Sequence, residues 1–165
     1  MLTDIEAAKY LISKDPEQRL FDRNSLIRRE NHTFYEGNAR LNKLLHLAQN
    51  IHIAKYGRPL FEAELYAYDN GVVSKRVLED YSRLVVSRAH PSISPDDAAF
   101  LDKIFDIFAN APIEDLIELS HEDSEWQEKI KGRNLAEQKI DSMSRAGEYR
   151  EQYADIIEYM DRMNV

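Results

Sequence analysis

The sequence predicts a mainly α-helical fold: a single compact helical domain of residues 1–165 around a central buried helix, with a pattern that allows one short β-hairpin. Only five glycines and five prolines occur in 165 residues, too few for the frequent turns of a β-sandwich. Apolar residues make up 43% and charged residues 32% of the chain, as in a globular domain with a solvated surface. A long run of apolar residues at helical spacing in the first half of the chain predicts the central buried helix.

The first element that the sequence predicts is an N-terminal helix. Thr3 followed by Glu6 is a capping-box pattern, in which each side chain accepts a hydrogen bond from a backbone N–H of the other residue. Ile5, Ala8 and Ile12 then recur at helical spacing, which predicts a helix of about a dozen residues.

The segment of residues 15–37 has the weakest pattern in the chain. Asp15 and Pro16 resemble a cap and a proline at the first helical position, so we expect the first helix to stop and another to start there. From Arg19 to Gly37 we expect a short helix and an irregular loop. Four arginines cluster in this segment: Arg19, Arg23, Arg28 and Arg29.

The clearest element is a helix from about Asn38 to Tyr56. Its apolar residues form one wide stripe, made of Leu41, Leu44, Leu45, Ala48 and Ile51 with Leu47, Ile53 and Ala54 beside them. A stripe of this width predicts a central, largely buried helix. Gly57 supplies a left-handed stop, and Pro59 prevents the helix from resuming.

A short extended segment follows. From Phe61 to Tyr68 apolar and polar residues alternate with a period of two, which is typical of a strand. The segment ends at Asp69-Asn70-Gly71, a turn sequence that favours a small hairpin. We expect a positive φ at Gly71, since only glycine adopts that conformation without strain.

The rest of the chain predicts further helices. Ser74, Ser94 and Pro112 each precede an apolar helical pattern in the way that a cap or a first-turn proline does. Beyond Trp126 we expect helix-like structure through residues 135–143 and again over residues 148–163, where Tyr149, Tyr153, Ile156, Ile157 and Met160 form an amphipathic stripe.

Composition excludes several classes of function. Without cysteine the chain has no disulfide, thiolate zinc site or cysteine nucleophile. A net charge of −8 opposes binding to nucleic acid phosphates. No glycine-rich loop supports a nucleotide cofactor, and we expect no cofactor. The sequence has neither a signal peptide nor a run of about 18 apolar residues, so we expect a cytoplasmic protein without a membrane partner.

Candidate chemical groups are sparse. His46 and His52 are six residues apart on different sides of their helix, which favours structural roles over a metal site. Ser120-His121-Glu122 contains the residue types of a hydrolase triad, but adjacent side chains on a helix diverge. A structural hydrogen bond is therefore favoured for His121, while Trp126 suits a core position or, as the alternative, an interface anchor.

Acidic residues are unevenly distributed. Between Glu114 and Glu128 seven acidic residues occur without a lysine or an arginine. The run is explained either by a solvated helix face or by a surface that attracts a basic protein partner.

Residues 41–49 read LNKLLHLAQ, residues 56–61 read YGRPLF, and residues 67–73 read AYDNGVV. In this order, they resemble the KL-x-KLLY-x-AQ, YG-x-PLF and AW-x-x-GPV motifs of the Panacea antitoxin family. Residues 119–122 (LSHE), with Trp126 downstream, are similar to a further family stretch. The resemblance covers about residues 41–126, and residues 7–11 match the usual first helix. Tyr68 replaces the family's Trp, Val72 replaces its Pro, and residues 15–37 form an atypically long insertion.

The resemblance implies a phage-associated, non-catalytic antitoxin that binds a cognate toxin by direct contact, with a protease as second partner if the chain acts as an adaptor. Three alternatives remain: a phage or mobile-element adaptor or regulator of the same fold, a hydrolase using Ser120, His121 and Glu122, and a DNA-binding regulator using the arginine cluster. We expect no catalytic residue and no metal site. The candidate partner-binding residues are Arg23, Arg28, Arg29, Phe34, Tyr35, Tyr68, His121 and Trp126.

Overall fold

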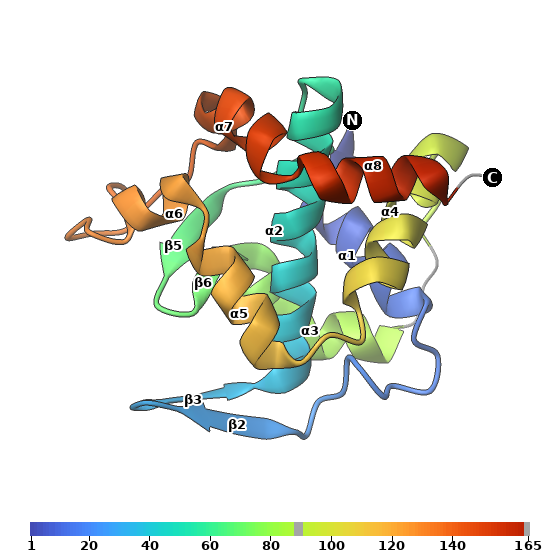
Figure 1. The fold of residues 1–165 in the computed structure, drawn as a ribbon. Coiled ribbons are helices and arrows are strands. Elements are labelled where there is room, and N and C mark those ends of the chain that lie inside the picture. The colour runs from blue at the N-terminus through green and yellow to red at the C-terminus, as the bar shows by residue number, and fades with distance from the viewer. Residues whose placement is uncertain (88–90, 164–165) are drawn as a thin grey trace.

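The fold is organised around one long helix, α2 (Glu36–Tyr56), which runs through the middle of the molecule (Figure 1). The computed structural model describes residues 1–87 and 91–163. Every residue from Arg40 to Ala54 is buried, so the central buried helix is confirmed. Its burial extends around the whole circumference, because other elements pack on all sides of it. Polar positions such as Lys43 are therefore as deeply buried as the leucines.

The N-terminal helix α1 (Asp4–Ser13) begins at the predicted capping box. Thr3 Oγ1 accepts a hydrogen bond from the Glu6 N–H, and the Thr3 N–H donates to Glu6 Oε1, both at 3.1 Å. Residues Leu2–Thr3 form β1, which pairs in parallel with β4 (Phe61–Glu62). The alternating segment after α2 therefore does not form one strand: its first two residues pair with the N-terminus, and only its second half enters the predicted hairpin.

That hairpin consists of β5 (Leu65–Tyr68) and β6 (Gly71–Ser74), joined by the two-residue turn Asp69-Asn70. Gly71 has a φ of +128°, which confirms the predicted positive φ. Gly57 ends α2 in the left-handed conformation, at a φ of +73°.

Three further helices start where the sequence predicts. They are α3 (Lys75–Ser87), α4 (Pro95–Phe108) and α5 (Ile113–His121). Ser74 Oγ accepts the Val77 N–H at 3.2 Å, and Ser94 Oγ accepts the Asp97 N–H at 3.1 Å. Together with α1 they bury the apolar side chains of α2 in one continuous core.

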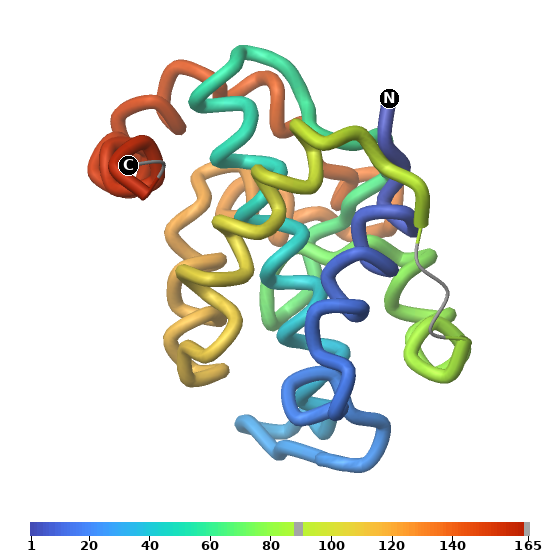
Figure 2. Tube along the Cα trace, turned by 90° about the vertical axis from the view of Figure 1, so that its right-hand side faces the viewer, coloured from blue at the N-terminus to red at the C-terminus, as the bar shows by residue number. Residues whose placement is uncertain are grey.

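The insertion of residues 15–37 differs from its prediction. No helix restarts after Asp15, because its carboxylate accepts the backbone N–H groups of residues 19, 20 and 21 and holds the chain in a loop. The loop leads into a second hairpin, β2 (Leu26–Arg29) and β3 (His32–Tyr35). This hairpin projects at one end of the molecule, beyond the start of α2 (Figures 1 and 2).

The C-terminal third also corrects the sequence prediction. After α6 (Ser124–Lys129) the chain is not helical over residues 135–141: the Ala67 N–H donates to Gln138 O and the Ile140 N–H to Leu65 O, so this stretch lies along the edge of β5. A 3₁₀ turn, η1 (Ser142–Arg145), then leads into the last helices. The expected helix over residues 148–163 is two helices, α7 (Ala146–Gln152) and α8 (Ala154–Arg162), separated at Tyr153.

Helices form most of the described chain, as the sequence predicts. Among residues 1–87 and 91–163, no helix combines the length and the apolar character needed to cross a membrane.

Candidate partner-binding site

The turn between β5 and β6 is held by two aromatic side chains from the end of α5 and from α6. The Trp126 indole Nε1–H donates to Tyr68 O at 2.8 Å, and His121 Nε2 lies 3.1 Å from Asp69 O. The two rings stack on each other, with centroids 4.1 Å apart and planes 10° from parallel. Burial lowers the pKa of His121; the hydrogen bond to Asp69 O opposes this shift, and the positive charges of Arg29 and Lys43 add to it. The ring is therefore neutral at pH 7, and its Nε2 carries the proton that the carbonyl accepts.

The β2–β3 hairpin contacts the same turn from the other side. Arg29 Nη1 lies 3.5 Å from Asn70 Oδ1, at the limit of a hydrogen bond, and His32 Nε2 lies 3.0 Å from an Asp69 carboxylate oxygen. Arg29 Nε also donates to Glu114 Oε2 on α5 at 3.0 Å. The insertion is thereby joined to the turn of the AYDNGVV motif by polar contacts.

Between the hairpin, the turn and α2 lies a cavity of about 250 Å³. Its outer part is formed by exposed residues, among them His32, Tyr35 and Asp69, whereas Asn42, Lys43 and Val73 are buried at its base. The full lining is His32, Thr33, Phe34, Tyr35, Asn38, Ala39, Asn42, Lys43, Tyr68, Asp69, Asn70, Val73 and Leu78. The cavity is smaller than the roughly 300–1,000 Å³ typical of small-molecule sites, and it suits a single side chain.

Lys43 is the unusual residue of this lining. It is 1% exposed, and its Nζ lies close to Gly71 and Ser120, because a Cβ built on Gly71 would be 3.0 Å from Nζ and 2.3 Å from Ser120 Oγ. Burial lowers the pKa of Lys43 to about 7. Within the described chain, its ammonium group has no hydrogen bond or ion pair.

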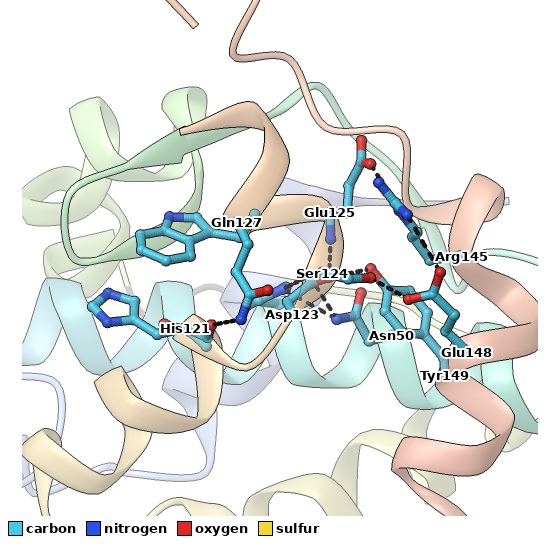
Figure 3. Close-up of polar contacts among 12 residues, drawn as sticks. Asn50, His121, Asp123, Ser124, Glu125, Gln127, Arg145, Glu148 and Tyr149 are labelled. Carbon is cyan, nitrogen blue, oxygen red and sulfur yellow. Dashed lines mark hydrogen bonds and ion pairs between the residues drawn. The ribbon is translucent and has the colours of Figure 1, made fainter. Parts of the chain in front are cut away.

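A second buried polar cluster fixes the position of α6. Asp123 caps that helix, and its carboxylate lies 2.6 Å from His46 Nε2 while accepting the Tyr149 hydroxyl at 2.7 Å and the Asn50 amide at 3.1 Å (Figure 3). Burial acts to raise the pKa of Asp123, but the hydrogen bonds from His46, Tyr149 and Asn50 outweigh it and hold the pKa at about 2. The cluster therefore joins α2, α6 and α7 through one buried carboxylate.

The geometry of this cluster determines which of its polar atoms carry a proton. Asp123 only accepts hydrogen bonds when ionised, so His46 Nε2 carries a proton and donates to it. The Asn50 amide group donates to Asp123 and to the Tyr153 hydroxyl, at 3.1 and 3.3 Å. The remaining polar side-chain atoms of His46 and Asn50, which are His46 Nδ1 and Asn50 Oδ1, are buried without a hydrogen-bond partner in the described chain.

An ion-pair cluster closes the same region from outside. Glu125 is 1% exposed and contacts Lys129 Nζ at 3.1 Å and Arg145 Nε at 3.2 Å (Figure 3). It also accepts the Asp141 N–H at 2.7 Å, and Arg145 further pairs with Glu128. These contacts attach the non-helical stretch after α6, so α6 and its Trp126 are held in place from both ends.

Six of the eight candidate residues gather around the turn. They are Arg29, Phe34, Tyr35, Tyr68, His121 and Trp126, either lining the cavity or bonded to its rim. Arg23 lies in the loop before the hairpin and Arg28 on an exposed position of β2, and neither lines the cavity. Sequence reasoning missed Lys43. Its one signal in the sequence is that a lysine lies within the apolar pattern of the most buried helix.

Ser120, His121 and Glu122 do not form, among the described residues, the hydrogen-bonded triad that the hydrolase alternative requires. Ser120 Oγ donates to Ile117 O at 2.8 Å and to Asn70 O at 3.3 Å, and His121 Nε2 lies 3.1 Å from Asp69 O. Both side chains are thus bonded to backbone carbonyls and, within the described chain, not to each other, while Glu122 is exposed. His46 and His52 are likewise separate: the first meets Asp123, and His52 Nδ1 meets Arg58 O at 2.7 Å. No group of three potential metal ligands occurs in the described ranges.

A family profile described as "Antitoxin SocA-like, Panacea domain" matches residues 41–127. The matched region contains the whole β5–β6 turn together with His121 and Trp126, and it begins after the β2–β3 hairpin. Comparisons with curated proteins and with solved structures found no match.

Proposed function

The chain belongs to the SocA-like Panacea antitoxin domain family, and from that premise we propose that it is a non-catalytic antitoxin that neutralises a cognate toxin by direct contact. The matched residues, 41–127, make up just over half of the 165-residue chain. They include most of α2 and the β5–β6 turn, which both line the cavity, and α5, which contacts the turn. The partner class is a toxin protein.

The observation that carries the proposal is the contact between the insertion and the family turn. Arg29 of the hairpin contacts Asn70, and Phe34 and Tyr35 line the same cavity as Tyr68. One face thus combines a framework of the family with a surface particular to this chain. Such a division suits a fold that binds varied partners, because discrimination belongs on loops and exposed segments.

The hairpin has the composition of an interface. Tyr35 is 46% exposed and Leu26 is 58% exposed, beside the exposed Arg28. Tyrosine and arginine are favoured anchors at protein interfaces, and apolar side chains inside a polar rim supply most of the binding free energy. Occlusion of a toxin's active surface needs no reacting group on the antitoxin. The proposal therefore agrees with Ser120 and His121 being bonded to backbone carbonyls of the turn and not to each other.

Co-expression tests the proposal. Each small gene adjacent to this one in its native genome is expressed alone and with this protein, and growth is measured. Growth arrest by one neighbour and rescue by this protein are expected. If no neighbour is toxic, or if the toxic one is not rescued, the antitoxin function is wrong.

Variants then locate the binding face. Deletion of residues 23–35 leaves Phe21 in the core and Asp22 bonded to Tyr81, so we expect a folded protein by circular dichroism that no longer rescues growth. Tyr35→Ala and Arg28→Ala should weaken rescue. Their matched controls are Tyr159→Ala and Arg150→Ala, two exposed residues of α8 and α7. Full rescue by the deletion variant would place recognition elsewhere.

The mode of neutralisation is tested with purified proteins. Direct contact predicts that the toxin loses activity on mixing with this protein alone, with no protease present. If the toxin stays active in the complex and disappears only in cells, the adaptor alternative replaces direct neutralisation.

A further inference from the structure

When protonated, Lys43 carries a charge at the base of the cavity that no group of the described residues neutralises. A lysine ammonium has three N–H donors, and a buried one without acceptors destabilises the fold. Asp69, the carboxylate of the cavity lining, already pairs with His32, and Glu114 on α5, outside the lining, pairs with Arg29. A methionine or leucine would fill the same volume without that cost. The position therefore suits a counter-ion supplied from outside the chain.

The other polar groups at the base of the cavity are already bonded. The Asn42 amide nitrogen donates to Asn38 O and Oδ1 at 3.1 and 3.0 Å, and its oxygen accepts the Ser74 N–H at 2.9 Å. The Asn38 amide nitrogen donates to Leu78 O at 3.0 Å. A molecule entering the cavity would find its polar complement chiefly in Lys43.

The walls restrict what can enter. Phe34, Tyr35 and Tyr68 present aromatic surface above the buried base, and the volume of about 250 Å³ has room for one side chain with its stem. A phosphate would favour an arginine fork, which the cavity lining does not contain, and the amide donors of Asn38 and Asn42 are already used. A carboxylate on a short aliphatic stem matches both the apolar walls and a single ammonium.

We propose that this cavity receives the side chain of an aspartate or glutamate of the bound protein, with the ammonium of Lys43 as its counter-ion. The inference rests on the proposed function, because it specifies the chemistry of the partner at the face already described. Buried, hydrogen-bonded charge pairs at interfaces contribute to affinity and fix the register between partners. The acidic residue would thus identify which segment of the toxin lies under the hairpin.

The first experiment needs no toxin. The full chain, with lysines labelled by carbon-13, is titrated with phenylacetate and, as a neutral control of the same shape, with benzyl alcohol. The Lys43 Cε resonance, assigned by its loss in Lys43→Met, should shift saturably with phenylacetate and not with benzyl alcohol. Lys131→Met, at an exposed lysine, should leave that shift unchanged. An unperturbed Lys43 resonance up to the solubility limit of phenylacetate would overturn the proposal.

The second experiment uses the toxin identified by co-expression. Lys43→Met should raise the Kd at least about tenfold, as expected when one partner of a buried charge pair is removed. One acidic residue of the toxin, changed to alanine, should cause a similar loss and add little to Lys43→Met in a double-mutant cycle. Equal binding by Lys43→Met and the parent would refute the acidic anchor and leave the antitoxin function intact. Conversely, failure of every neighbour to bind would refute the antitoxin function, while the phenylacetate titration still decides the cavity.

Discussion

The imidazole of His121 lies parallel to the indole of Trp126, and both rings bond to consecutive carbonyl groups of one turn, those of Asp69 and Tyr68. The two side chains come from the end of α5 and from α6, so the stack joins these helices to the β5–β6 hairpin. The sole tryptophan is half-buried and serves the framework of the candidate site. It packs, partly buried, against the core, and its role as an interface anchor stays a prediction.

Trp126→Phe should remove the N–H donor while keeping an aromatic ring against His121. The loss of one hydrogen bond to a backbone carbonyl predicts a decrease in the free energy of unfolding of about 1 kcal/mol. Trp126→Ala also removes the stack and the buried ring surface, and should cost on the order of 2–3 kcal/mol. Urea unfolding followed by circular dichroism measures both. Equal stabilities of the Phe variant and the parent would show that the indole hydrogen bond contributes nothing.

Gly71→Ala should be strongly destabilising. Its φ of +128° strains any residue with a Cβ, and that Cβ would lie 2.3 Å from Ser120 Oγ and 3.0 Å from Lys43. We expect a loss of about 3 kcal/mol or more in the free energy of unfolding.

Two other glycines provide the controls for this variant. Gly57 has a φ of +73°, and no atom lies within 4 Å of the position that a Cβ would take there, so Gly57→Ala should cost only the backbone strain, about 1 kcal/mol. Gly147 lies in α7 with open space around it, and Gly147→Ala should be neutral or slightly stabilising. Thermal unfolding should rank the three in that order, and a Gly71 variant as stable as the Gly147 variant would contradict the crowding argument.

Leu44→Ala and Leu45→Ala should each cost about 2–5 kcal/mol through lost burial and the cavity left behind. The two side chains are 0% and 1% exposed on α2. Leu26→Ala, at a leucine that is 58% exposed on β2, is the matched control and should change stability little. If the melting temperatures of the α2 variants stayed within about a degree of the parent, those leucines could not occupy the core.

The elements that the sequence predicts correctly are those with local signals. Thr3, Ser74 and Ser94 cap helices through side-chain hydrogen bonds made within three residues, so each start is encoded by neighbours. The positive φ of Gly71 is likewise signalled locally, by a glycine at the end of the turn sequence Asp69-Asn70-Gly71.

The elements that it predicts wrongly depend on distant contacts. Residues 135–141 have a helix-like pattern, yet Gln138 and Ile140 bond to the edge of β5, about 70 positions earlier in the chain. The β2–β3 hairpin is half-exposed, so no buried face imposes the alternation by which a strand is recognised. The role of Lys43 at the cavity depends on which neighbours fold against it, and its position in a helical pattern does not contain that information.

Tyr149→Phe should make the protein more sensitive to acid. Asp123, with a pKa held at about 2, stabilises the folded state above the ordinary carboxyl pKa near 3.8, and this contribution is lost as the pH falls between these values. Removal of the Tyr149 hydroxyl takes away the 2.7 Å hydrogen bond to the carboxylate and raises the pKa of Asp123. We expect a loss of about 2 kcal/mol at pH 7 and acid unfolding at a higher pH than the parent. Tyr159→Phe, on exposed α8, should titrate as the parent does, and coincident acid curves for the two variants would remove Asp123 from this role.

Lys43→Met should stabilise the protein, and by an amount that depends on pH. Lys43 has a pKa of about 7 when folded and near 10.5 when exposed, so between these values the unfolded chain binds more protons and the stability of the parent rises with pH. The cost of the buried ammonium is fully present below about pH 7 and is on the order of 4 kcal/mol. Because Met carries no charge, the stability gain of the variant should be largest there and should decline toward about pH 10.

The difference in unfolding free energy between Lys43→Met and the parent reports on Lys43, because the other titratable groups are present in both proteins. His32 and Asp69 line the same cavity, and Arg29 and His121 contact the turn at its rim; all four are present in both proteins. Urea unfolding at about pH 6, 8 and 9.5 measures the trend, with Lys131→Met as the exposed control that should show none. A constant difference across this range would mean that Lys43 keeps an ordinary pKa. The ammonium would then have to be neutralised within the fold, and an acidic side chain of the partner would not be needed to balance it.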